Sequence, residues 1–233
     1  MKELYVVHLA QWPIMQQLQL EEALLRTDHR NWCLVNHGSP PAIVMGISGK
    51  AERLIAPHSP LPVIRRCSGG GTVVVDPNTL FFTLICNRTA LSIEPYPEPI
   101  LSWMAQLYAP LFEHGFALSE NDFTLHGKKF AGHAQYLSKE RWLHHTTLLY
   151  DYNDEYMNYL LIPEKQPNYR QNKPHHEFVC RLKEFAPDKN GLLRNLIGQL
   201  NHHFNVIPVT PTDWQEVLDR EHRKSTRCLS GVV

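Results

Sequence analysis

The sequence RRCSGGGTVVVD, residues 65–76, sets three consecutive glycines between a pair of arginines and a run of valines. Each glycine loses much backbone entropy on folding, so three together weaken a strand. Close approach of the backbone to a ligand is the usual compensation, and adjacent free N–H groups in such a turn bind anions. Arg65 and Arg66 can add bidentate contacts to phosphate or carboxylate oxygens. The segment therefore predicts two short strands joined by an anion-binding loop.

Two alternatives for these glycines stay open from the residues alone. A flexible hinge or a β-bulge would also place glycines here, with the two arginines as solvated charges. The segment is not a Walker A loop, because the sequence GK[ST] is absent. It is also not a GxGxxG loop that opens a helix, because β-branched valines follow it.

Apolar residues on both sides of the loop repeat at strand or helix spacing. Strands are expected at residues 4–7, 32–35, 42–45, 63–64, 80–85 and within 122–150. Helices are expected at residues 15–26, 100–111, 193–204 and 214–218. Strands and helices alternate without regular βαβ spacing, which favours an α+β fold with a mixed or antiparallel sheet over a doubly wound sheet.

Details of these elements carry further expectations. The strands at 32–35 and 42–45 are interpreted as a hairpin or as two strands joined by a turn. Glu21 and Glu22 are assigned to the polar side of the first helix. Pro110 is expected to kink or shorten its helix. Residues 163–175 are predicted to form a loop, and the tail from Arg223 is expected to be frayed.

Composition excludes several classes of protein. The 233 residues carry 23 Lys+Arg against 23 Asp+Glu, which argues against a broadly basic protein that binds nucleic acid. No run of about 18 apolar residues exists, so no transmembrane helix is expected, and the N-terminus is a poor signal peptide. The five cysteines form no CxxC motif, which favours reduced thiols in the cytoplasm. A chain of this length predicts a single domain over residues 1–233.

A second motif, GKKFAGHAQ, lies at residues 127–135. Strand alternation puts Lys128 and Lys129 on opposite faces, so only one of them can face a site. A buried lysine beside a phosphate stays protonated, because the anion offsets the cost of desolvation. A polar hairpin tip is the alternative for the same residues.

Together, the two motifs resemble those of the lipoate–protein ligase A family, the lipoyl branch of the biotin/lipoate ligase catalytic fold. The segment 65–76 is similar to the family's RRxSGGGxVxHD, and residues 120–135 are similar to its RND…KxxGxAQ element. Residues 18–26 (LQLEEALLR), 42–48 (AIVMGIS) and 144–149 (HHTTLL) resemble its early helix, the following strand and its HHGTLL strand. The resemblance covers most of residues 1–182, and residues 183–233 are expected to complete the domain as helices.

The resemblance implies a role for each matching residue. Lys129 matches the family's essential lysine, which touches both the acyl carbonyl and the α-phosphate, and Asp122 matches a residue near the nucleotide and its metal. The implied ATP and adenylate site comprises Arg66, Gly69, Gly70, Gly71, Thr72, Val73, Val74, Asn121, Asp122 and Lys129. The implied lipoate site comprises Gly46, Arg65, Ser68, Gly70, Lys129 and His145.

The implied activity is that of a lipoate–protein ligase. ATP and Mg²⁺ would activate lipoate or octanoate as an acyl-adenylate, and the acyl group would pass to a lysine of a lipoyl carrier domain. Such domains belong to 2-oxoacid dehydrogenases or to the glycine cleavage H protein; nucleic-acid and membrane partners are not expected. The alternatives are a transferase that uses preformed acyl-AMP or an acyl-carrier donor, and a non-catalytic protein that binds lipoate or nucleotide.

The sequence departs from the family pattern at several positions. Val75 replaces the histidine of the signature, and Thr146 replaces the glycine of HHGTLL. Arg141 is a weak candidate for a phosphate ligand, and Cys67 is more consistent with a half-buried spectator than with a nucleophile. No small C-terminal accessory domain of the family is recognisable, so a separate partner protein could supply that part.

Overall fold

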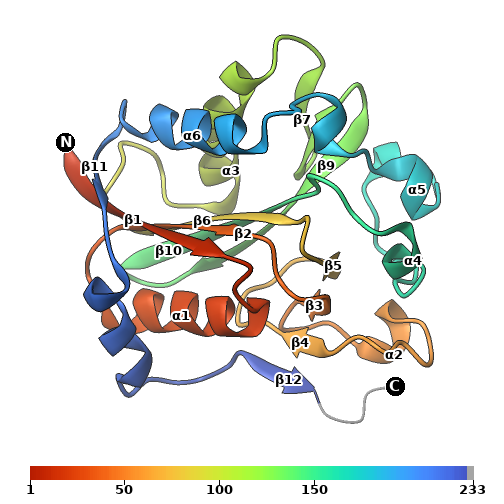
Figure 1. The fold of residues 1–233 in the computed structure, drawn as a ribbon, viewed down its shortest axis with the longest axis horizontal. Coiled ribbons are helices and arrows are strands. Elements are labelled where there is room, and N and C mark those ends of the chain that lie inside the picture. The colour runs from red at the N-terminus through yellow and green to blue at the C-terminus, as the bar shows by residue number, and fades with distance from the viewer. Residues whose placement is uncertain (230–233) are drawn as a thin grey trace.

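An eight-stranded mixed sheet forms the centre of the protein (Figure 1). The computed structural model describes residues 1–229. The strand order is β11-β1-β2-β6-β10-β9-β8-β7, with β1 parallel to both β2 and β11 and the other neighbours antiparallel. The strands are β1 (Lys2–Ala10), β2 (Trp32–His37), β6 (Leu80–Asn87), β7 (Phe116–Ser119), β8 (Asp122–Leu125), β9 (Lys128–Leu137), β10 (Arg141–Leu148) and β11 (Phe204–Pro208). This arrangement confirms the predicted α+β class and the mixed sheet.

A smaller, four-stranded sheet has the order β12-β4-β3-β5. Its strands are β3 (Ala42–Met45), β4 (Val63–Arg65), β5 (Val73–Val75) and β12 (Arg227–Leu229). Because β2 and β3 belong to different sheets, the hairpin interpretation is wrong and the alternative of two strands joined by a turn is correct. Gly38 has a positive φ of 103°, and the two prolines after Ser39 lack the N–H groups that a continuing ladder needs. The turn therefore leads the chain from one sheet to the other.

Helices cover both faces of the large sheet (Figure 1). Helix α1 (Ile14–Thr27) packs on one face through Leu20, Ala23 and Leu24, and α3 (Pro97–Tyr108) and α6 (Lys189–Leu200) lie on the other. Pro110 falls in the 3₁₀ turn Ala109–Leu111 that ends α3, as predicted. The remaining helices are α2 (Ala51–Leu54), α4 (Asp154–Met157) and α5 (His175–Phe178). No helix within residues 1–229 is long and apolar enough to cross a membrane.

Three expectations for the C-terminal region need correction. Phe204 begins β11 rather than ending a helix, because α6 stops at Leu200 and a turn separates the two residues. The segment Gln215–Asp219 is a 3₁₀ helix. The tail is not frayed throughout: β12 pairs with β4, so residues 183–229 supply two strands besides their helices. Residues 230–233 lie outside the described part of the chain.

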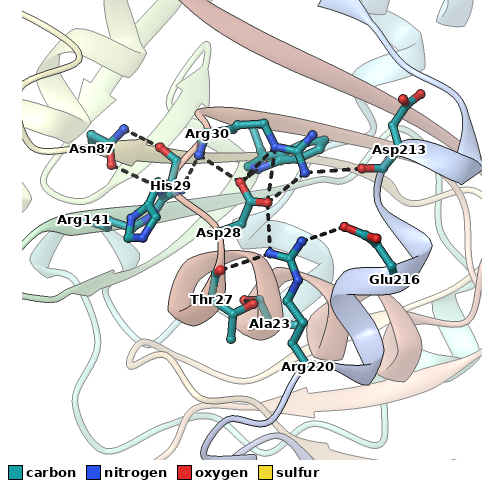
Figure 2. A network of polar contacts seen from close by, with 11 residues as sticks. Ala23, Thr27, Asp28, His29, Arg30, Asn87, Arg141, Asp213, Glu216 and Arg220 are labelled. Atoms are coloured by element: carbon teal, nitrogen blue, oxygen red, sulfur yellow. Dashed lines mark hydrogen bonds and ion pairs between the residues drawn. The ribbon is translucent and has the colours of Figure 1, made fainter.

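A polar network fastens the C-terminal region to the end of α1 (Figure 2). Asp28 is buried and contacts Arg30 at 2.8 Å and Arg220 at 3.4 Å. Arg220 also donates to the backbone oxygen of Thr27 and to Glu216. Burial raises the pKa of Asp28, but the hydrogen bonds from Arg30 outweigh it and lower that pKa to about 2. The carboxylate therefore joins the end of α1 to the C-terminal segment while staying ionised.

Candidate active site

The glycine loop joins β4 to β5, and the side chain of Arg66 holds it through hydrogen bonds. This side chain is 5% exposed and donates from Nε to Ser68 Oγ at 3.0 Å. Its Nη2 donates to the carbonyl oxygens of Gly69 at 2.6 Å and Gly71 at 2.9 Å. Burial lowers the pKa of Arg66 to about 10, which leaves it cationic at neutral pH. One buried cation therefore fixes the shape of the loop.

Two glycines are required by the geometry around this loop. Gly70 has a φ of +95°, which side-chain-bearing residues rarely adopt. A Cβ at Gly46 would collide with the carbonyl oxygen of Gly70, and Ile47 donates to Ser68. The loop therefore packs directly against the backbone of Gly46, where any side chain would prevent the contact.

A small cavity of about 90 Å³ opens between the loop, α1 and the two sheets. Its apolar wall consists of Ile14, Leu18, Val44, Val73, Val75 and Phe81. Its polar lining consists of Gln17, Arg66, Thr72, Thr83, Lys129, His133, His145, Thr146 and Thr147. The strands at 42–45 and 80–85 contribute to this wall through Val44 and Phe81. The strand at 32–35 does not line it.

Lys129 faces the cavity from β9, whereas Lys128 is exposed on the other face. The alternation expected from the sequence is therefore confirmed. The Nζ atom of Lys129 lies 2.6 Å from Asp122 Oδ1, and Tyr169 donates its hydroxyl to Asp122 Oδ2 at 2.8 Å. Burial, together with the neighbouring Asp122, raises the pKa of Tyr169. Lys129 is thus paired with a carboxylate that is itself held by the loop 163–175.

A buried polar chain runs behind the cavity. His145 Nε2 lies 2.9 Å from Ser68 Oγ, and its Nδ1 lies 2.6 Å from Glu21 Oε2. Gln17 and Thr83 both donate to Glu21 Oε1 at 2.8 Å. The sequence analysis did not identify Glu21, Gln17 or Thr83 as part of the site. Its assignment of Glu21 to the polar side of α1 is wrong. Glu21 is 0% exposed, because α1 packs its glutamate side against β6 and β10.

The assignment of Glu22, the next residue of α1, to the polar side of the helix is also wrong. It is 1% exposed and accepts hydrogen bonds from the backbone N–H groups of Ser225 and Thr226. Arg26 lies 3.0 Å from it. The residues just before β12 therefore cover this side of the helix, and the glutamate pair is buried between two different parts of the protein.

The remaining candidate residues are dispersed. Arg65 is partly exposed and donates to the backbone oxygen of Ile47 at 2.7 Å. Asn121 is exposed in the turn before β8, beside Asp122 but away from the cavity lining. Val74 is buried in the second sheet with its side chain outside the cavity lining. Arg141 donates to Asn87 and to the backbone of Arg30 at the far end of β10, so it is not placed as a phosphate ligand.

Cys67 and Asp122 are the residues that bear on a cysteine nucleophile and on a bound metal ion at this site. Cys67 is 2% exposed, and burial raises its pKa to about 12, so it stays a thiol. No cluster of three or more His, Cys, Asp or Glu side chains within residues 1–229 could hold a metal ion. Mg²⁺ typically needs only one or two carboxylates when phosphates supply its other ligands. Asp122, which contacts Lys129, is a carboxylate of this kind.

The arrangement can therefore bind an anion with an apolar tail. Lys129 and Arg66 bring two positive charges to one cavity, and backbone N–H groups of the glycine loop add further donors. The apolar wall opposite them suits a hydrocarbon chain. Both cations are paired with oxygen atoms of the protein itself.

Curated proteins of similar sequence are lipoate–protein ligases by name. The chain is 25% identical to "Inactive lipoate–protein ligase 2" of Plasmodium falciparum, covering 89% of this chain and 71% of that protein. It is 26% identical to the lipoate–protein ligase LplJ of Bacillus subtilis, covering 86% of this chain and 64% of that protein. The chain thus spans about two thirds of the length of these relatives.

Solved structures share the fold. A lipoate–protein ligase A bound with ATP superposes with a TM-score of 0.70 at 16% identity, over 94% of this chain and 95% of that chain. The Thermoplasma acidophilum bi-partite lipoate protein ligase, studied with its E2 lipoyl domain, gives 0.69 at 18% identity, over 94% and 92%. The profile described as "Lipoyl protein ligase A/B catalytic domain" matches residues 13–200. Because this match takes in most of the chain, the protein belongs to the family of lipoyl protein ligase A/B catalytic domains.

Proposed function

We propose that this protein activates lipoate or octanoate with ATP and transfers the acyl group to a lysine of a lipoyl carrier domain. The observation that carries the proposal is the position of Lys129, whose ammonium group shares one cavity with Arg66 and with an apolar wall. A carboxylate with a hydrocarbon tail and a phosphate would both find their complement there. Family membership and the fold shared with an ATP-bound ligase support the same activity.

In the first step, a carboxylate oxygen attacks the α-phosphorus of ATP and pyrophosphate leaves. Two anions must approach each other, so positive charge fixed beforehand lowers the barrier. Lys129 and Arg66 supply that charge once substrate oxygens replace Asp122 and the loop carbonyls as their partners. Mg²⁺, held by the phosphates with Asp122 as one protein ligand, would neutralise the charge on the leaving pyrophosphate.

In the second step, the lysine amine of the carrier domain attacks the acyl carbonyl and AMP leaves. Lys129 can donate to the oxygen that becomes negative in this step. No enzyme nucleophile is needed, which agrees with the buried, protonated state of Cys67. The acceptor would be a carrier domain of the kind paired with the Thermoplasma ligase.

The glycine loop borders the cavity, and Arg66, Gly71 and Thr72 line it on that side. Arg66 closes one side of the cavity through its bonds to Gly69 and Gly71. We expect the acyl group to enter as this loop moves, which couples acyl binding to the release of the Arg66 guanidinium toward the nucleotide.

A second function has support from one observation. The relative from Plasmodium falciparum carries the name of an inactive ligase, which favours a protein that binds lipoate or adenylate without turnover. Transfer from preformed lipoyl-AMP, with a separate protein making the adenylate, is the other alternative.

One assay separates these three functions. Purified protein is mixed with lipoate, Mg²⁺, ATP and a lipoyl carrier domain, and pyrophosphate release and carrier mass are measured. Ligase activity gives pyrophosphate and a lipoylated carrier, and a transferase lipoylates only from supplied lipoyl-AMP. Binding without either product identifies a binding protein.

Replacing Lys129 tests the site assignment directly. We expect Lys129→Ala to lower adenylation by a factor of about 10² or more, because a preorganised charge is lost. Lys128→Ala is the matched control, since that side chain is exposed on the opposite face of β9. Equal activity of Lys129→Ala and the unmodified protein would refute the assignment.

A further inference from the structure

A chain of buried polar side chains leads from Arg66 away from the cavity. It runs from Arg66 Nε to Ser68 Oγ at 3.0 Å and from Ser68 Oγ to His145 Nε2 at 2.9 Å. It ends at Glu21, whose Oε2 lies 2.6 Å from His145 Nδ1. Glu21 comes from α1 and His145 from β10, whereas Arg66 and Ser68 belong to the segment after β4, so the chain ties two elements to the glycine loop.

The direction of each hydrogen bond follows from the chemistry of its ends. His145 Nδ1 lies 2.6 Å from Glu21 Oε2, and because a carboxylate can only accept, this contact favours forms of His145 that carry a proton on Nδ1. When such a ring is neutral, its Nε2 atom accepts the hydroxyl proton of Ser68. Ser68 Oγ in turn accepts from Arg66 Nε, which can only donate. At its far end, Glu21 Oε2 contacts His145 closely but makes no hydrogen bond.

Glu21 is itself fixed by two further donors. Gln17 and Thr83 both donate to its Oε1, and Gln17 accepts from the amide of Asn36. The apolar contacts of α1 with the sheet come from Leu20, Ala23 and Leu24. A buried carboxylate is costly and is often replaceable by apolar groups without loss of stability. Packing of the helix alone therefore does not explain this carboxylate.

We propose that Glu21 and His145 are positioning residues, which act through Ser68 to hold Arg66 and the glycine loop in the geometry that receives the nucleotide phosphate. Glu21 contributes in two ways: it selects the tautomer of His145, and its negative charge favours the cationic form of Arg66. Ser68 is 0% exposed and does not line the cavity, so it is a link in the chain and not a nucleophile. This proposal rests on the proposed function for its ligand.

Glu21→Gln tests the chain with a minimal change. The amide oxygen keeps the donors Gln17 and Thr83, so the amide NH₂ then faces His145 Nδ1. The ring must shift its proton to Nε2, and the hydroxyl of Ser68 loses its acceptor. We expect binding of an acyl-sulfamoyl-adenosine, a stable analogue of the acyl-adenylate, to weaken by about tenfold or more. We also expect faster amide hydrogen exchange in residues 66–72.

Glu22→Gln is the matched control, because it alters the adjacent buried carboxylate of the same helix without touching the chain. It should leave binding of the analogue unchanged, and its faster hydrogen exchange should appear in residues 224–229 and not in residues 66–72. Ser68→Ala, which removes one oxygen from the middle of the chain, should reproduce both effects and replaces Glu21→Gln if that variant does not fold. In an Arg66→Ala background, Glu21→Gln should cause no further loss of affinity, because the two residues act in series.

Three results would overturn the proposal: unchanged affinity and exchange in both Glu21→Gln and Ser68→Ala, an equal loss in Glu22→Gln, or losses that multiply in the double variant. If the unmodified protein does not bind the analogue, the proposed function fails. Hydrogen exchange then still decides the positioning role, since it needs no ligand.

Discussion

Each cation of the site is already engaged by an acceptor of the protein. Lys129 pairs with Asp122, and Arg66 donates to two carbonyl oxygens of the glycine loop. Such pairing keeps a buried positive charge from standing alone, which would be costly. It also means that a ligand competes with internal partners, so the affinity for an anion reflects a difference between two sets of hydrogen bonds.

Val75 is the residue at which the cavity wall departs from the family signature. It is 1% exposed and lies in a buried apolar cluster with Ile14, Leu18 and Phe81. We expect Val75→His to lower the free energy of unfolding by roughly 1–3 kcal/mol, because the imidazole gains no visible partner among these side chains. Urea denaturation measures the loss, and Val73→His, at a half-buried neighbour, should lose less. Equal stability of both variants would contradict this account of the wall.

Cysteine reactivity gives a second prediction at this scale. Cys228 is exposed, whereas Cys67 is buried with a pKa raised to about 12. We expect iodoacetamide at pH 8 to alkylate Cys228 in the native protein and to leave Cys67 unmodified until the protein unfolds. Mass spectrometry of proteolytic peptides measures both sites. Rapid native alkylation of Cys67 would show that the loop opens far more often than its hydrogen bonds imply.

Local patterns predicted the elements whose neighbours are close in sequence. The valine run after the glycines and the alternation around Lys129 are local signals, and both were confirmed. Glu21 was misplaced because its partners Thr83 and His145 are distant in sequence, and a helix that is covered on two sides looks amphipathic when taken alone. Phe204 lies four residues after Leu200, so its spacing predicted that it continued the helix. A turn separates the two residues, however, and Phe204 begins a strand. The spacing of apolar residues alone cannot reveal such a turn.

Helix α1 and β12 depend on each other through Glu22. Its carboxylate accepts two backbone N–H groups just before β12, and although burial raises its pKa, these hydrogen bonds lower it. We expect Glu22→Gln to lower the free energy of unfolding by about 1–3 kcal/mol, the typical effect of weakening hydrogen bonds to a buried charged acceptor. Faster hydrogen exchange in residues 224–229 should accompany it. Unchanged exchange there would mean that pairing with β4 alone holds the strand.

At the scale of the whole molecule, the Asp28 network makes the free energy of unfolding depend on pH. The folded pKa of Asp28, about 2, lies below the unfolded value of about 3.9. The stabilisation is therefore complete above pH 4 and is lost as the pH falls from about 4 to 2, with a magnitude of the order of 2 kcal/mol. Asp28→Asn should flatten this part of the stability curve, whereas Asp219→Asn, at an exposed carboxylate, should leave it unchanged. Chemical denaturation between pH 2 and 6 measures both.

The pairing of β1 with β11 has a consequence for the order in which the protein is made. Residues 2–6 are synthesised about 200 residues before their parallel partners, residues 204–208. Until β11 emerges, β1 therefore has an open edge, and the large sheet cannot be completed on that side. Chaperones that shield strand edges would act during this interval, and a pause in translation before residue 204 would lengthen it.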